Sequence, residues 1–179
     1  MHEVIEAHEA HESRDDNPLM LPVAVTLAIL AVLVAIATLL GHRAGTEEII
    51  LQTKAADQWA LFQAKNIRLH EMQSVADLLG TFSPVDKEKA QALREKYMKE
   101  ADRYEKEKEG VTEQARELER ERDLAGRRAD RYETGEVILE IALIICSLTL
   151  LTKKRIFWLS GIALGLIGLC TALSGLLLH

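Results

Sequence analysis

The chain has 179 residues and a formal net charge of −6, and 48% of its residues are hydrophobic while 28% are charged. The acidic balance disfavours nucleic acid as a partner. Hydrophobic and charged residues are segregated, because 18 of the 22 Lys and Arg residues lie within residues 41–136 and three other segments are almost free of charge. This pattern predicts an all-α membrane protein with three transmembrane helices and a charged segment outside the bilayer.

Residues 1–18 form an acidic tail rich in His and Glu. His2, His8 and His11 are weak candidates for metal ligands, because His and Glu three or four positions apart can share a helical face. The spacing is not that of an H-E-x-x-H motif, since one residue separates Glu9 from His11. A solvated tail is the favoured interpretation, and no metal or other cofactor is predicted.

The first predicted span covers residues 19–40 and contains no charged residue. At about 1.5 Å per residue it is long enough to cross a bilayer core of about 30 Å. It follows an acidic tail and not a basic one, so it is interpreted as a retained anchor and not as a cleaved signal peptide. Small residues recur along it with spacings of four and three, at Ala24, Ala28, Ala31, Ala35 and Thr38.

Residues 41–136 are predicted to form a long antiparallel helical hairpin, similar to a coiled coil. A helix either continues from the first span or restarts at Thr46. Gly80 is expected to end this helix in the left-handed conformation, with Ser83 capping the next helix and Pro84 in its first turn. Each helix has a seam with four-three spacing. The first seam comprises Leu51, Ala55, Gln58, Phe62, Lys65, Leu69, Met72, Ala76 and Leu79. The second comprises Tyr97, Ala101, Tyr104, Lys108, Val111, Ala115, Leu118, Arg122, Ala125, Ala129 and Tyr132.

The first hairpin helix has more apolar surface than one partner helix would cover. This additional stripe comprises Ala56, Trp59, Ala60, Ile67, Val75 and Leu78. An apolar face that one neighbour cannot cover predicts a second neighbour. We therefore expect a homo-oligomer.

Two further spans are predicted at residues 137–152 and 156–178, joined by a basic turn at residues 153–155. Glu140 is the one acidic residue in these apolar segments. Intramembrane carboxylates can mark ion paths, but Glu140 is expected near the membrane interface and not at the midplane. Cys146 and Cys170 are expected at different depths and therefore unpaired.

Small residues also follow four-three spacing in the third span, at Gly161, Gly165, Gly168, Ala172 and Gly175. Small faces allow close approach of helices in a bilayer. This face is predicted to pack against another helix, and the sequence leaves open whether that helix belongs to the same chain or to another copy.

The segment Asp57–Arg68, DQWALFQAKNIR, follows soon after the first span. It resembles the signature segment of a bacterial membrane family known as domain of unknown function 4337. The resemblance extends to the His/Glu-rich beginning, the charged helical middle and the two closing spans with their basic turn. It implies a protein of the bacterial envelope, and it brings no catalytic residues.

Two roles remain open for this segment. Trp59, Phe62, Gln63 and Ile67 are predicted to pack between hairpins. In the alternative role, Lys65 and Arg68 form a recognition strip for lipid headgroups or for an acidic partner. Packing is the favoured interpretation.

No phosphate loop, triad or convergent polar set is found, so the sequence predicts no enzyme. The first hypothesis is an oligomeric membrane scaffold whose helical stalk docks or organises a larger membrane complex. The alternative is a component of an ion channel or transporter, with Glu140 lining a cavity and Lys108 or Arg122 facing it. The resemblance implies a location in the bacterial plasma membrane. The short basic turn predicts an extracytoplasmic hairpin, although Arg43, Arg127, Arg128 and Arg131 favour the opposite orientation.

Overall fold

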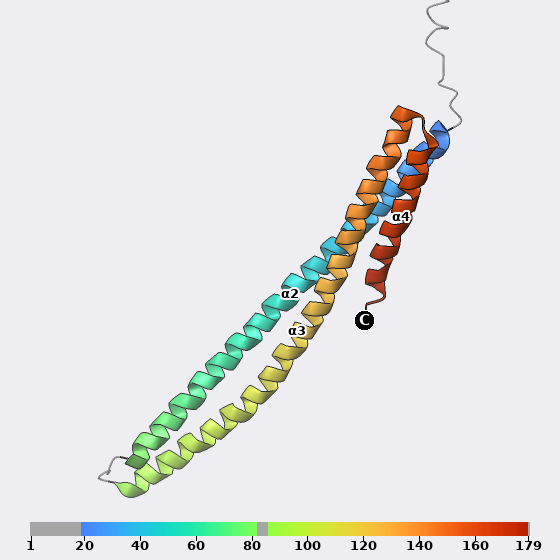
Figure 1. The fold of residues 1–179 in the computed structure, drawn as a ribbon. Coiled ribbons are helices and arrows are strands. Elements are labelled where there is room, and N and C mark those ends of the chain that lie inside the picture. Colours follow the sequence, from blue (N-terminus) through green and yellow to red (C-terminus); the bar gives the residue numbers. More distant parts are fainter. Residues whose placement is uncertain (1–18, 82–85, 179) are drawn as a thin grey trace, which may run out of the picture. The chain divides into compact units, whose positions relative to one another are not determined.

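The computed structural model describes residues 19–81 and 86–178 (Figure 1). This part of the chain forms three helices and no strand: α2 (Met20–Thr81), α3 (Lys87–Thr152) and α4 (Arg155–Leu176). The prediction of an all-helical fold is confirmed. Each helix contains a stretch long and apolar enough to cross a membrane.

Helix α2 is continuous for 62 residues, so the first apolar segment runs without a break into the charged one. The predicted left-handed end at Gly80 is wrong, because α2 continues to Thr81 and no glycine in the described ranges has a positive φ. Ser83 and Pro84 lie outside the described residues. Helix α3 begins at Lys87.

Asp86 is the residue that caps α3. Its Oδ1 accepts a hydrogen bond from the backbone N–H of Lys89 at 3.1 Å, which satisfies one of the free donors of the first turn. The side chain of Lys89 also lies 2.9 Å from Asp86 Oδ2. Both contacts lower the pKa of Asp86, and the side-chain contact has the larger effect.

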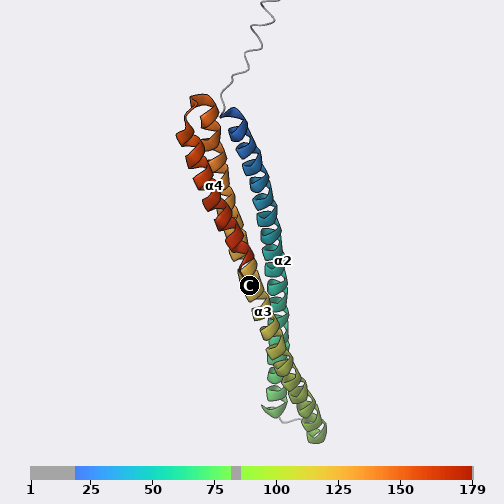
Figure 2. The same cartoon turned by 90° about the vertical axis from the view of Figure 1, so that its right-hand side faces the viewer.

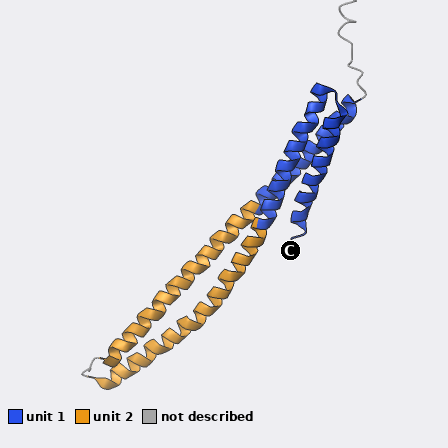
Figure 3. Ribbon diagram, viewed as in Figure 1, with its two compact units in different colours: residues 1–44, 127–179 blue, residues 45–126 orange. Residues whose placement is uncertain are grey.

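The chain divides into two compact units, which are described separately (Figure 3). Unit 1 comprises residues 1–44 and 127–179, described for 19–44 and 127–178. Unit 2 comprises residues 45–126. Helices α2 and α3 contribute to both units, whereas α4 belongs to unit 1.

Unit 2 is an antiparallel pair of helices. Trp59 contacts Glu119 and Lys65 contacts Glu107, so the residue numbers rise along α2 as they fall along α3. The seam residues predicted for α2, and those predicted for the unit 2 part of α3, are all buried or half-buried. With α3 as its one neighbour inside this unit, α2 buries its seam against α3.

Unit 1 contains three helices, which lie side by side in both views (Figures 1 and 2). Helices α3 and α4 are antiparallel and joined by Lys153 and Lys154, and Lys153 takes a positive φ of 52°. At the far end of α4, the Arg128 guanidinium donates two hydrogen bonds to the Leu178 carbonyl oxygen, at 3.0 and 2.8 Å. This contact provides two donors for a carbonyl just beyond the end of α4.

The five small residues predicted as one face of the third span are all buried in α4. A Cβ atom added at Gly161 would lie 3.0 Å from Cys146 Cβ, and one added at Gly168 would lie 3.0 Å from the Gly135 carbonyl oxygen. The glycine face therefore packs mainly against α3 of the same chain. This placement answers the question that the sequence left open.

Helix α2 completes unit 1 through an apolar core and two polar contacts. Val23, Leu30 and Ala37 are buried together with Leu139, Ala142 and Cys146. Trp158 Nε1 donates to Thr26 Oγ1 at 3.1 Å, and Thr38 Oγ1 donates to Glu136 Oε1 at 2.6 Å. These hydrogen bonds tie α2 to α4 and to α3, respectively.

Candidate functional site

The signature segment Asp57–Arg68 forms the polar and aromatic contacts that hold the two helices of unit 2 together. Trp59 Nε1 donates to Glu119 Oε1 at 2.9 Å, and the Trp59 ring meets the Phe62 ring edge-on, with centroids 5.6 Å apart and an interplanar angle of 81°. Lys108 Nζ lies 5.8 Å from the Phe62 ring centroid and donates to Asn66 Oδ1 at 3.3 Å. Trp59 and Phe62 thus pack inside their own hairpin.

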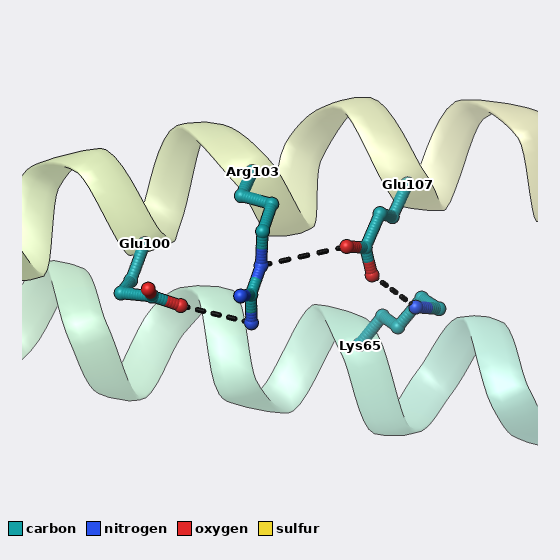
Figure 4. Close-up of polar contacts among 4 residues, drawn as sticks. All are labelled: Lys65, Glu100, Arg103 and Glu107. Atoms are coloured by element: carbon teal, nitrogen blue, oxygen red, sulfur yellow. Dashed lines mark hydrogen bonds and ion pairs between the residues drawn. The ribbon is translucent and has the colours of Figure 1, made fainter.

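Lys65 lies at one end of an ion-pair chain that continues through Glu107 and Arg103 to Glu100 (Figure 4). Its ammonium pairs with Glu107 Oε2 on α3, while Arg103 Nε lies 3.4 Å from Glu107 Oε1 and Arg103 Nη2 lies 2.8 Å from Glu100. The Lys65 side chain is only 20% exposed. The charge of Lys65 is thus paired inside the hairpin, as the favoured packing interpretation implies, and the recognition strip stays an untested alternative.

The chain of ion pairs makes the stability of unit 2 depend on pH. The hydrogen bond from Lys65, and its charge and that of Arg103, lower the pKa of Glu107 below its ordinary value of 4.5. A lowered folded-state pKa gives stability that is present above the ordinary value and lost as the pH falls through the folded-state value. We expect unit 2 to lose amide protection as the pH falls below the ordinary Glu value of 4.5, most clearly at low salt.

Hydrogen exchange followed by mass spectrometry checks this expectation. Glu107→Gln should remove part of the acid-dependent loss, whereas Glu109→Gln, at an exposed position two residues away, should leave it unchanged. Equal pH profiles for the wild type and Glu107→Gln would show that this carboxylate contributes nothing.

The side of α2 opposite α3 is exposed and contains little charge. We call this the outer face of α2; it comprises Ile49, Thr53, Ala56, Ala60, Gln63, Ile67, Glu71, Ser74 and Leu78. The spacing is four and three with one extra step of four, and Glu71 is the single charged member. Ile49, Ile67 and Leu78 are 66%, 60% and 54% exposed. Gln63 and Ile67, predicted as packing residues, are thus both exposed.

The two helices of unit 2 differ sharply in charge. Asp, Glu, Lys and Arg make up 8 of the 37 residues in 45–81 but 23 of the 40 residues in 87–126. The part of α3 in unit 2 thus has the composition of a helix that faces water. The outer face of α2 instead has the composition of a helix face that packs against another helix. Arg68, beside this face, is exposed and pairs with Glu71 at 3.5 Å.

Glu140 lies in unit 1, and its side chain is exposed. Its neighbours Leu139 and Ala142 lie against Gly168 and Gly165 of α4, and these glycines are in the middle of that 22-residue helix. Glu140 is therefore level with the centre of α4. Its expected position near the membrane interface stays a prediction, and the contact of Arg128 with Leu178 shows that α3 lies beside the end of α4 well before Val137.

The remaining candidates are the amino-terminal histidines, the two cysteines, and Lys108 and Arg122. His2, His8 and His11 lie outside the described residues, and residues 19–81 and 86–178 contain no group of three or more His, Cys, Asp or Glu side chains that could hold a metal ion. Cys146 is buried and Cys170 exposed, and both are free thiols. Lys108 and Arg122 are bound to Glu105 and Asp123, both on α3 itself.

A family model described as a domain of unknown function, DUF4337, matches residues 19–178. The chain belongs to this family. Neither the curated proteins nor the solved structures include a significant match. The match covers all three helices, so both units are part of the family's domain.

Proposed function

We propose that this DUF4337 protein is a non-enzymatic membrane scaffold whose copies associate through the outer face of α2. In this proposal the three apolar segments cross the membrane, and the charged hairpin of unit 2 forms a coiled-coil-like stalk in water. The observation that supports it is the exposed and nearly uncharged outer face, which lies on a helix whose partner α3 is heavily charged.

The spacing of the outer face favours another helix as its cover. A four-three repeat places apolar side chains along one line of a helix, which is the geometry of coiled-coil contacts. From Ile49 to Leu78 the face extends for about 44 Å at 1.5 Å per residue, or about four heptads. This length is enough for a stable helix pair.

A second copy is the simplest source of that helix. Most soluble and membrane oligomers are assembled from identical chains, and copies anchored in one membrane bring their α2 helices together at the same height. Gln63 would then meet Gln63 of the other copy, and two amides can hydrogen-bond to each other. Arg68 at the border of the face is a candidate contact for an acidic group of a larger membrane complex.

Native mass spectrometry of the full chain in mild detergent tests this proposal. We expect multiples of the 20.0 kDa chain for the wild type. Ile67→Glu should shift the protein to the monomer, because a charge would be buried in the contact. Met98→Glu, at an exposed apolar position on α3, should leave the oligomer intact. A wild type found only as a 20.0 kDa monomer would contradict the proposal.

A channel or transporter component is the second candidate, and the position of Glu140 level with the centre of α4 favours it. A charged carboxylate at the centre of a bilayer costs at least about 2.5–3.5 kcal/mol, so such residues usually face a cavity or a partner. Ion flux in proteoliposomes that is lost on Glu140→Gln would support this candidate over the scaffold.

We also propose that the protein resides in a bacterial plasma membrane with the hairpin outside the cytoplasm. Lys153, Lys154 and Arg155 lie at a short turn, where positive charge is most informative about the cytoplasmic side. A cysteine at the exposed position Gln91 should react with an impermeant maleimide before the plasma membrane is lysed. Reaction only after lysis would reverse the orientation.

A further inference from the structure

Glu140 lies on an apolar surface of unit 1 without an intrachain partner. Its side chain is exposed, and no hydrogen bond or ion pair joins it to another residue of the described ranges. In contrast, the carboxylate one turn earlier, Glu136, accepts a 2.6 Å hydrogen bond from Thr38 Oγ1 of α2. Glu136 thus has a hydrogen-bond donor within the chain, whereas Glu140 has none among the described residues.

The alanine face of α2 adjoins Glu140. Ala24, Ala28, Ala31 and Ala35 are all exposed, and Thr38 continues their four-three spacing on the same side of the helix. Since Thr38 bonds to Glu136, and Glu140 lies one turn beyond Glu136 on α3, these alanines and Glu140 border the same side of the α2–α3 contact. Small side chains there allow another helix to approach closely.

The basic groups of unit 1 are too far along its helices to neutralise Glu140. Its described Lys and Arg residues lie at the two ends: Arg43, Arg127, Arg128 and Arg131 beside the end of α4, and Lys153, Lys154 and Arg155 at the α3–α4 turn. A second copy of the chain in the same membrane would place its own Glu140 at the same height. It would not bring a Lys or Arg side chain there. The complementary charge must come from a different helix.

We propose that this surface binds the transmembrane helix of a different protein, one with a Lys or Arg side chain near the middle of its span. The ammonium or guanidinium pairs with Glu140, and the alanine face of α2 packs against the backbone of that helix. This inference rests on the proposed membrane insertion of the three helices. It assigns the heteromeric contact to unit 1, while self-association uses the outer face of α2 in unit 2.

Model peptides test the inference without knowledge of the natural partner. The full chain, reconstituted in lipid bilayers, is mixed with a fluorescent Leu/Ala transmembrane peptide containing one central Lys, or with the same peptide containing Leu or Glu there. Energy transfer measures association. The wild type should bind the Lys peptide about tenfold more tightly than the Leu peptide. Glu140→Gln should abolish this preference, and Glu140→Lys should transfer it to the Glu peptide.

Matched variants test the packing surface. Ala31→Leu should weaken binding of the Lys peptide, whereas Ala163→Leu, at an exposed alanine of α4, should not. Equal binding of the Lys and Leu peptides by the wild type would overturn the inference, as would an unchanged preference in Glu140→Gln. Dissociation of the protein's own oligomer by Ala31→Leu would assign the surface to a second copy and would also overturn it.

Failure of membrane insertion is measured separately. Retention of the wild type in the bilayer after an alkaline wash supports the three spans. A washed-out wild type would overturn the span assignment and this inference with it. A retained wild type that does not prefer the Lys peptide overturns the inference alone and leaves the scaffold proposal in place.

Discussion

Gly168→Leu is expected to separate α3 from α4 and to destabilise unit 1 by more than about 3 kcal/mol, at or beyond the upper end of ordinary overpacking. A Cβ atom at Gly168 would lie 3.0 Å from both the Gly135 carbonyl oxygen and the Leu139 backbone nitrogen. Backbone atoms of a helix cannot rotate out of the way as a side chain can. The two helices must therefore move apart along much of their contact.

Gly165→Leu provides the matched comparison. The nearest atom to a Cβ there is Leu30 Cδ2, at 2.8 Å, which is the flexible end of a side chain. Its cost should be smaller than that of Gly168→Leu. The readout is maleimide labelling of Cys146, which is fully buried, in a Cys170→Ser background during a detergent unfolding titration. Equal labelling in the wild type and Gly168→Leu would show that the glycine face is not a tight contact.

Trp59→Ala is expected to cost unit 2 about 2–3 kcal/mol, less than the 3–5 kcal/mol of a fully buried Trp because this side chain is half-buried. The substitution removes the indole hydrogen bond to Glu119 and the edge-on contact with Phe62. Hydrogen exchange should show faster exchange across 45–126, with less change in unit 1.

The variant Trp59→Phe separates the two contributions. It keeps an aromatic ring and loses only the hydrogen bond, which contributes about 1 kcal/mol. We expect it to lose less than half of the protection lost in Trp59→Ala. Equal losses in the two variants would mean that the hydrogen bond, and not the ring, holds this part of the hairpin together.

The helices and their buried faces could be predicted from the sequence because periodicity reports which side of a helix is covered. The seam from Leu51 to Leu79 is buried or half-buried, and the glycine face from Gly161 to Gly175 is buried. The covering helix could not be predicted, since a small-residue face has the same spacing whether its partner is α3 or another copy. The short distances from Gly161 and Gly168 to atoms of α3 show that the covering helix is α3.

Relations between distant segments could not be predicted. The partner of Lys65 is one of them, because nothing in the local sequence places Glu107, 42 residues later, opposite to it. The level of Glu140 along α4 could not be predicted, because the apolar run of residues 137–152 does not show where α3 begins to face α4. The packing of Gly135 against Ala172 shows that α3 faces α4 well before that run begins. Gly135 is a small residue within a charged stretch, and this was the feature of the sequence that could have indicated a close contact with α4 there.

Disulfide cross-linking in native membranes tests the central claim most directly. With Cys146 and Cys170 replaced by Ser, a cysteine at Ala60 on the outer face of α2 should form a disulfide-linked dimer on mild oxidation. A cysteine at Lys106, exposed on α3, should remain monomeric under the same conditions. No dimer from the Ala60 position, or equal dimer from both positions, would contradict the assignment of the outer face of α2 as the contact between copies.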